Sequence, residues 1–330
     1  MAYNLDGTNG EEFGFTKAIA GFALRAMHES SGLVDVTSVV QPNQGNQFLV
    51  PNFAPITYQD YAPNAAPATG GFGAGGAVEQ NPALTQREIT ATPAVAATAF
   101  DVFYAWTTSF ELAATLGQEL GESYAEKVDQ RVCGAFLDFK ADIGDTNYST
   151  PADGFDRPVE LGAVELIEEG ETPVDASATS ASVLGLVRII KTKYKKARLP
   201  GSPTVVLDVD QMERMLSELT GGAVSQSGGA NLSMLGNELL ETGKIESVYG
   251  CRVMFSTFLP TANRAVNGAA ADDIKVGAYF HDSALYTVLK EGLQIKMGEK
   301  PGGLQQWLTG LAYMGAGVGD RRRGGAINIA

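Results

Sequence analysis

The chain has 330 residues, of which 44% are apolar and 19% are charged, so it can bury a sizeable core and is not a disordered acidic chain. Its formal net charge of −14 and isoelectric point near 4.6 argue against tight binding of free nucleic acid, which requires a basic face. Dense basic runs occur only at residues 191–198 and 321–323. No run is long and apolar enough for a membrane span, and no signal peptide is recognisable, so we expect folding in a cytoplasm.

Residues 11–29 are predicted to form a short amphipathic helix. Apolar residues recur there at helical spacing, namely Phe15, Ala18, Ile19, Phe22, Ala23, Ala26 and Met27. Because little chain precedes this helix, we expect another element to cover its apolar face.

Residues 41–97 are predicted to form a long β-hairpin that projects from the body. Its arms are extended in character, and residues 62–83 between them consist almost entirely of Ala, Pro, Gly, Asn and Thr, which suits a loop tip. An isolated monomer would leave most of such a projection unburied.

Residues 108–142 are predicted to form one long amphipathic helix. Its apolar residues recur at every fourth position, namely Leu112, Leu116, Leu120, Tyr124, Val128, Val132 and Phe136. A spacing of four exceeds the helical turn of ~3.6 residues, so the apolar face winds and must contact different neighbours at the two ends. Gly117, Gly121 and Gly134 indicate close approach of another backbone, since glycine weakens a helix interior.

The second half of the chain mixes helices and strands. Residues 143–179 are polar, acidic and interrupted by Pro and Gly, which predicts an irregular connection. A helix follows from Ser180, with Val183, Leu184, Val187, Ile190 and Tyr194 on one face. A buried strand at 204–207 then leads into a helix capped by Asp208 or Asp210. Further strands are expected before 260, at 272–280 with a short helical turn after it, and after 293. The predicted class is α+β.

No catalytic, cofactor or metal site is predicted. Gly71, Gly73 and Gly76 satisfy GxGxxG, but they lie in a loop and not between a strand and a helix. His28 and His281 have no cluster of partners around them, and Cys133 and Cys251 lack CxxC spacing, so we interpret the cysteines as small buried residues.

Two basic stretches leave alternatives open, and two acidic pairs have a simpler interpretation. The basic run 191–198 could contact phosphate or an acidic neighbouring surface, or it could complement the dipole at a helix C-terminus. The arginines at 321–323 could form salt bridges at an interface or be solvated. The carboxylate pairs at 168–169 and 272–273 favour solvated loops.

The order of these parts resembles, over essentially the whole chain, the major capsid proteins of tailed double-stranded DNA phages, which have the Hong Kong 97-type fold. Residues 183–216 resemble the helix, turn, strand and helix of such subunits, and residues 237–260 resemble their recurrent strand pair with its Leu-Pro exit. Residues 309–329 are similar to the last strands in short-tailed phages. The resemblance implies an N-arm (1–40), an E-loop (41–97), a peripheral domain (98–175) with spine helix 108–142, an axial domain (176–288), and a return to the peripheral domain with C-terminal strands (289–330).

The resemblance also implies a function. The chain is expected to self-assemble into hexamers and pentamers of an icosahedral phage head that encloses double-stranded DNA without sequence-specific binding. Expected partners are a separate scaffolding protein, a portal and cement proteins, and no membrane. The expected location is the virion, after assembly in the host cytoplasm. The alternatives are an encapsulin-like nanocompartment shell and an unrecognised acidic cytoplasmic hydrolase.

Ten residues are predicted to contact other subunits. They lie on the N-arm, the E-loop and the basic tract near the C-terminal strands, and are Phe15, Ile19, Phe22, Phe48, Val50, Phe53, Tyr58, Arg321, Arg322 and Arg323.

Overall fold

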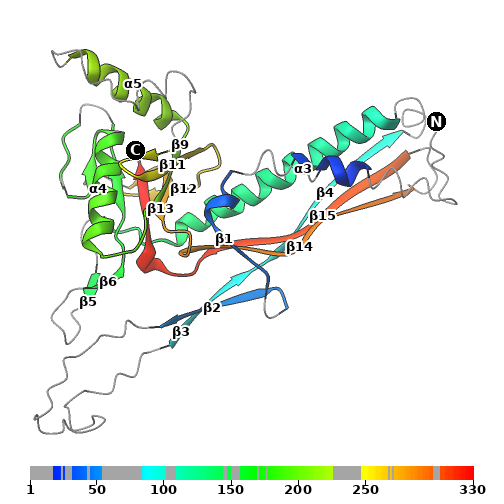
Figure 1. Ribbon diagram of the computed structural model, residues 1–330, viewed down its shortest axis with the longest axis horizontal. Coiled ribbons are helices and arrows are strands. Elements are labelled where there is room, and N and C mark those ends of the chain that lie inside the picture. The colour runs from blue at the N-terminus through cyan, green and yellow to red at the C-terminus, as the bar shows by residue number, and fades with distance from the viewer. Residues whose placement is uncertain are drawn as a thin grey trace, which may run out of the picture.

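The computed structural model of the chain describes residues 18–23, 25–26, 32–42, 45–53, 84–101, 109–143, 147–149, 157–168, 171–175, 177–225, 247–266, 268–269, 271–299 and 305–330. Helices and strands are mixed along these ranges, which confirms the predicted α+β class. There are two main sheets, of which the smaller runs alongside one long helix and the larger lies at one end of that helix (Figure 1). Within the described ranges, no helix is long and apolar enough to cross a membrane.

The larger sheet has eight strands. In spatial order they are β10 (Ser247–Val248), β11 (Cys251–Ser256), β9 (Thr204–Asp208), β13 (Asp272–Phe280), β16 (Gly324–Ile329), β7 (Val164–Leu166) and β8 (Thr179–Ser180), with β12 (Thr261–Arg264) also paired to β13. β13 runs antiparallel to β9 and β16, whereas β11 is parallel to β9 and β7 is parallel to β16. Strands from both sides of the predicted domain boundaries at 176 and 289 belong to this sheet, since β7 lies before the first and β16 after the second. The division into domains stays a prediction.

Two helices accompany this sheet. α4 (Val183–Lys196) begins where the Ser182 hydroxyl accepts from the Gly185 N–H, and its last turn is basic, as predicted. Its buried face contains Leu186 where the spacing predicted Leu184. α5 (Asp210–Ser225) follows β9, as predicted. Asp208 and Asp210 both pair with Lys275 Nζ at the start of α5, and the capping role expected for one of them stays a prediction.

The smaller sheet has four strands, in the order β1 (Ser38–Val40), β14 (Leu285–Glu299), β15 (Gln305–Val318) and β4 (Thr92–Asp101). A separate hairpin of β2 (Gln47–Phe53) and β3 (Leu84–Thr90) lies beside it, and β5 (Asn147–Ser149) pairs with β6 (Arg157–Glu160). The pairing of β2 with β3 confirms the two extended arms expected around residues 62–83, and those residues lie outside the described ranges. Short 3₁₀ helices are η1 (Val34–Val36), η2 (Ala135–Asp138) and η3 (Arg321–Arg323).

The long helix α3 (Ser109–Gly134) packs along the smaller sheet and reaches the larger one (Figure 1). Its N-terminal half packs Leu116 and Leu120 against Leu308 of β15, and its C-terminal half buries Val128 and Val132 in the main core. The winding apolar face therefore contacts different neighbours at its two ends, as predicted. The helix ends at Gly134 and not at 142, because the chain tightens into η2 and then becomes extended at 139.

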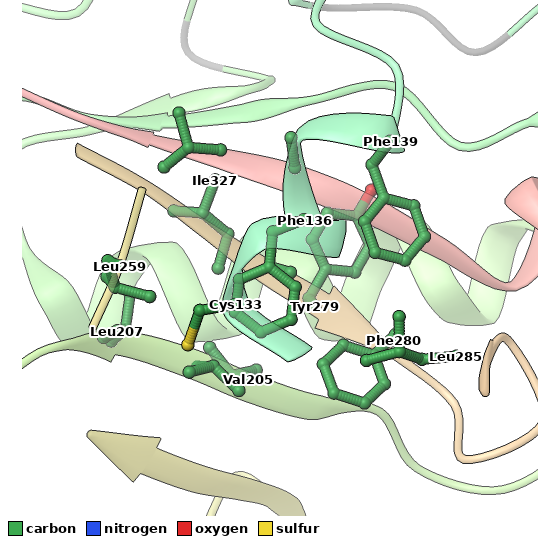
Figure 2. Close-up of a cluster of buried hydrophobic side chains, with 14 of the residues drawn as sticks. Cys133, Phe136, Phe139, Val205, Leu207, Leu259, Tyr279, Phe280, Leu285 and Ile327 are labelled. Atoms are coloured by element: carbon green, nitrogen blue, oxygen red, sulfur yellow. The ribbon is translucent and has the colours of Figure 1, made fainter. Parts of the chain in front are cut away.

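The main core lies where η2 meets the larger sheet (Figure 2). The Phe136 and Phe280 rings approach to 5.9 Å between centroids, and Phe139 stacks on Phe280 at 6.5 Å. Buried Tyr279 donates its hydroxyl to the Gly162 carbonyl oxygen at 2.7 Å, so its polar group is satisfied inside the core.

Two local predictions were wrong. Residues 161–167 are fully part of the core through β7, although the surrounding sequence predicted an irregular connection. Their acidic member, Glu165, is buried because it accepts from the Thr179 hydroxyl at 3.0 Å. The short helical turn expected after β13 is also absent from this described stretch, since a turn at 282–284 leads directly into β14.

Candidate functional site

The N-terminal helical segment, residues 18–23 and 25–26, is seated on α3, and we call it the arm helix. Ile19 and Ala23 are fully buried there with Leu116 and Leu120 of α3 and Leu308 of β15. The close approach depends on two glycines, because neither leaves space for a side chain on that face of α3.

Gly117 and Gly121 set the distance between the two helices. A Cβ at Gly117 would lie 2.6 Å from Phe22 Cβ and 2.7 Å from the Ile19 carbonyl oxygen. A Cβ at Gly121 would overlap the Ala23 carbonyl oxygen. The predicted close approach is therefore confirmed at both positions, whereas a Cβ at Gly134 would meet no atom of the described residues within 4 Å and the prediction was wrong there.

The arm helix thus has its covering surface within the same chain. Ile19 is used inside the subunit in this arrangement, and Phe22 is half-buried beside Gly117. Phe15 lies outside the described residues. The intersubunit role expected for these three residues stays a prediction.

The β2–β3 hairpin is seated where β15 leaves the smaller sheet. Val50 and Ile89 are buried with Ala91 and Val288. Asn52 donates to the Gly319 carbonyl oxygen at 2.6 Å, and Arg87 donates to that of Val318 at 3.3 Å.

Three glycines spaced two apart at the end of β15 and just beyond it form the surface under this hairpin. A Cβ at Gly315 would overlap the Thr90 carbonyl oxygen, and one at Gly317 would lie 2.9 Å from Ile89 Cγ1. One at Gly319 would overlap the Tyr286 ring. This seat was not predicted from the sequence. The alternation of glycine on one face of a strand was the available signal, since it marks close approach of another backbone.

The predicted E-loop contacts fall on this hairpin. Phe48 is half-buried and its ring lies 5.8 Å from that of Tyr286, and Val50 is buried within the subunit. Phe53 is the last residue of β2, paired with Leu84. Tyr58 lies outside the described residues. Their role between subunits stays a prediction.

The arginines of η3 form ion pairs within the chain. Asp320 binds Arg322 through both carboxylate oxygens, at 2.8 and 2.9 Å, and lies 3.4 Å from Arg323. Arg321 lies 3.4 Å from Glu160, and Arg323 donates to the Ser283 hydroxyl at 2.6 Å. The tract therefore fixes the turn between β15 and β16, and any contact with another subunit would add to these bonds.

A buried carboxylate joins α3 to the segment that follows the arm helix. Burial raises the pKa of Asp129 to about 6, although the N–H groups of Leu33 and Gly32 donate to it, and the nearby charge of Asp35 adds to the rise. One of its oxygens is buried without a hydrogen-bond partner in the described structure. Buried Cys133, one turn further along α3, also faces this region.

Replacing Asp129 with Asn is expected to stabilise the subunit at pH 7 and not at pH 4. A raised carboxyl pKa contributes stability that is fully present below the unfolded value of 3.8 and is lost as pH rises through about 6. A shift of this size corresponds to about 3 kcal/mol. Urea denaturation of both chains at pH 4 and pH 7 measures it, and a difference that does not change with pH would contradict this account.

A catalytic or metal site is not found among the described residues. His281 accepts from the Ser283 N–H at 3.2 Å and so belongs to the turn before β14, while His28 lies outside the described ranges. No group of three or more His, Cys, Asp or Glu residues that could hold a metal ion occurs in the part of the chain that the structure describes. The cysteines are buried and free, as predicted, and burial raises the pKa of Cys133 to about 12, which keeps its thiol protonated.

Solved structures with the same arrangement are shells of phages and related particles. The capsid of cyanophage P-SCSP1u superposes with a TM-score of 0.60 at 14% identity, covering 91% of this chain and 88% of that one. The mature capsid of bacteriophage PhiM1 gives 0.58 at 16% identity, covering 91% and 87%. A virus-like particle from Pyrococcus furiosus gives 0.52 at 8% identity, covering 94% and 98%.

No family model and no curated protein matches the sequence. At such low identity the likeness establishes the fold. The likeness extends over about nine-tenths of both chains. The chain has the Hong Kong 97-type fold of phage major capsid proteins.

Proposed function

We propose that the chain is a major capsid protein that assembles into a closed icosahedral shell. The observation that carries the proposal is the likeness to capsid subunits, which covers about nine-tenths of both chains. The capsid subunits that the chain resembles support a structural role and not an enzymatic one.

The acidic composition supports a container for double-stranded DNA. A net charge of −14 opposes tight, salt-dependent adhesion to phosphates, so packaged DNA would stay mobile inside such a shell. We propose hexamers and pentamers as its units, a separate scaffolding protein, a portal and cement proteins as its partners, and the virion as its location after assembly in the host cytoplasm. The likeness to the Pyrococcus furiosus particle favours a closed shell of some kind, and a nanocompartment shell is the second candidate.

Deleting residues 62–83 is expected to leave a soluble subunit that forms no closed shells. Residues 54–61 would still connect Phe53 to Leu84, so the β2–β3 pairing can close, whereas the tip available to a neighbour is lost. Negative-stain electron microscopy after co-expression with the adjacent genes measures the outcome. Normal particles from the deletion variant would contradict the role given to this loop.

A matched variant separates the length of this loop from its sequence. Replacing residues 62–83 with a Gly/Ser segment of equal length keeps the reach of the loop and removes its side chains. Shells from this variant and none from the deletion would assign the requirement to reach. A compact, active monomer on gel filtration from the unaltered chain would instead favour the hydrolase alternative and overturn the proposal.

A further inference from the structure

The larger sheet carries opposite charges at its two ends. β7, β9 and β16 run in one direction, so their carboxyl ends meet at one edge together with the start of the antiparallel β13. α4 follows β8 and returns toward the amino ends of the strands. There Lys191 donates to the Ser202 hydroxyl at 2.9 Å and lies 3.5 Å from the Gly250 carbonyl oxygen.

The end where α4 finishes is basic, and we call it the basic end: Arg188, Lys191, Lys195 and Tyr249. The three cations lie at positions i, i+3 and i+7 of α4 and therefore share one face of the helix. The structure records no ion pair for the side chains of Arg188 and Lys195 among the described residues, and both are exposed.

Tyr249 adds an aromatic anchor to the basic end. It occupies the β10–β11 turn next to Gly250, its side chain is 56% exposed, and its φ of 51° is in the left-handed region. Such a conformation costs free energy for a residue other than glycine, and an exposed large aromatic ring gains nothing from the chain's own core. Exposed Tyr beside cations is the composition of an interface centre.

The opposite end is a hollow of about 680 Å³ with an acidic lining, and we call it the acidic cleft. Six carboxylates line it beside the two cations Arg264 and Lys275: Glu168, Glu171, Asp208, Asp210, Asp272 and Asp273. Lys275 binds Asp208 and Asp210, and Arg264 donates to Asn328 at 2.9 Å, so both cations are already engaged within the chain.

We propose that the basic end of one copy of this chain docks into the acidic cleft of the next copy. The charges are complementary and the cleft has room for an aromatic ring. Since the two surfaces lie at opposite ends of one sheet, the contact is head-to-tail and not two-fold, and a head-to-tail contact that closes generates a ring. The inference rests on the proposed function, since it gives the ring contact within a capsomer.

Charge reversal tests the contact in both directions. Arg188→Glu with Lys195→Glu places like charges opposite the cleft, and Asp272→Lys with Asp273→Lys does the same from the other side. Each pair is expected to lower the yield of closed shells about tenfold or more, because like charges across an interface repel. Combining all four substitutions in one chain restores opposite charges, so it is expected to restore the yield to within about twofold of the unaltered chain.

Two further variants make the test specific. Glu122→Lys with Glu126→Lys changes the net charge of exposed α3 residues by as much as the cleft pair and is expected to leave the yield unchanged. Tyr249→Asn keeps a residue that tolerates a positive φ and removes the ring, so it is expected to lower the yield while leaving the thermal stability of the isolated subunit unchanged. Circular dichroism of each subunit separates misfolding from failed docking.

The outcomes distinguish this inference from the proposed function. Shells of normal yield from both reversal pairs would overturn the inference and leave the shell function standing. Failure of the four-fold variant to recover, with its subunits folded, would also overturn direct pairing. An unaltered chain that forms no closed particle when co-expressed with its adjacent genes would overturn both.

Discussion

Gly121→Ala is expected to loosen the arm helix from α3 and to destabilise the subunit by about 1–3 kcal/mol, the usual cost of overpacking. The added Cβ would overlap the Ala23 carbonyl oxygen and lie 2.9 Å from Ala26 Cβ. Neither neighbour can move without displacing the arm helix, since one is backbone and the other is the first atom of a side chain. The burial of Ile19 and Ala23 would be lost with that displacement.

Gly134→Ala is the matched control on the same helix. Its Cβ would meet no atom within 4 Å in the part of the chain that the structure describes, and its backbone is right-handed helical, with φ −56° and ψ −34°. Alanine there is expected to stabilise by about 0.5–1 kcal/mol, since glycine is the weaker helix former. Thermal unfolding, with limited proteolysis near residue 24 to report detachment of the arm, checks both. Equal effects of the two substitutions would show that α3 needs no close approach at Gly121.

Phe280→Ala is expected to destabilise the subunit by about 3–5 kcal/mol, the range for removing a large aromatic ring from a packed core. Phe280 ends β13 and is fully buried between Phe136 and Phe139 of the segment that follows α3. Gly324 at the start of β16 comes so close that a Cβ there would lie 2.8 Å from Phe280 Cβ. The ring therefore joins the long helix to the larger sheet, and the site has little freedom to collapse around a cavity.

Leu137→Ala is the control for this core, since Leu137 lies next to Phe136 in the 3₁₀ helix η2. Its side chain is 40% exposed, so its loss is expected to change the free energy of unfolding by less than about 0.5 kcal/mol. Urea denaturation of the three chains measures the difference. A cost for Phe280→Ala as small as that of the control would mean that the junction repacks and does not hold helix and sheet together.

The sequence predicted elements well where one periodicity ran long enough to be read. The apolar residues of α3 and α4 predicted both helices, and the alternation in 305–318 predicted a strand. Gly117 and Gly121 predicted a close approach but could not say which element approaches, because that information lies in the arm helix about 95 residues earlier.

The features that were not predicted depend on partners from distant parts of the chain. β7 is three residues long and contains Glu165, which is buried in the fold and accepts there from the hydroxyl of Thr179, a residue of another strand. The seat of the hairpin needs residues 89–91 against Gly315 and Gly317, and Tyr286 and Val50 against Gly319, and no local pattern specifies those contacts. Two interpretations of the basic run of α4 were left open by the sequence. Only the fold shows that this run lies at one end of the larger sheet and an acidic hollow at the other end.

The position of β16 has a consequence for biosynthesis. This strand is inserted between β13 and β7, so residues 324–329 separate two parts of the sheet that are made much earlier. While a ribosome is still translating the chain, those parts cannot be joined, and the surfaces at both ends of the sheet are not yet complete. A polypeptide truncated before this strand is therefore expected to lack the complete larger sheet, because β13 and β7 have no strand between them to pair with.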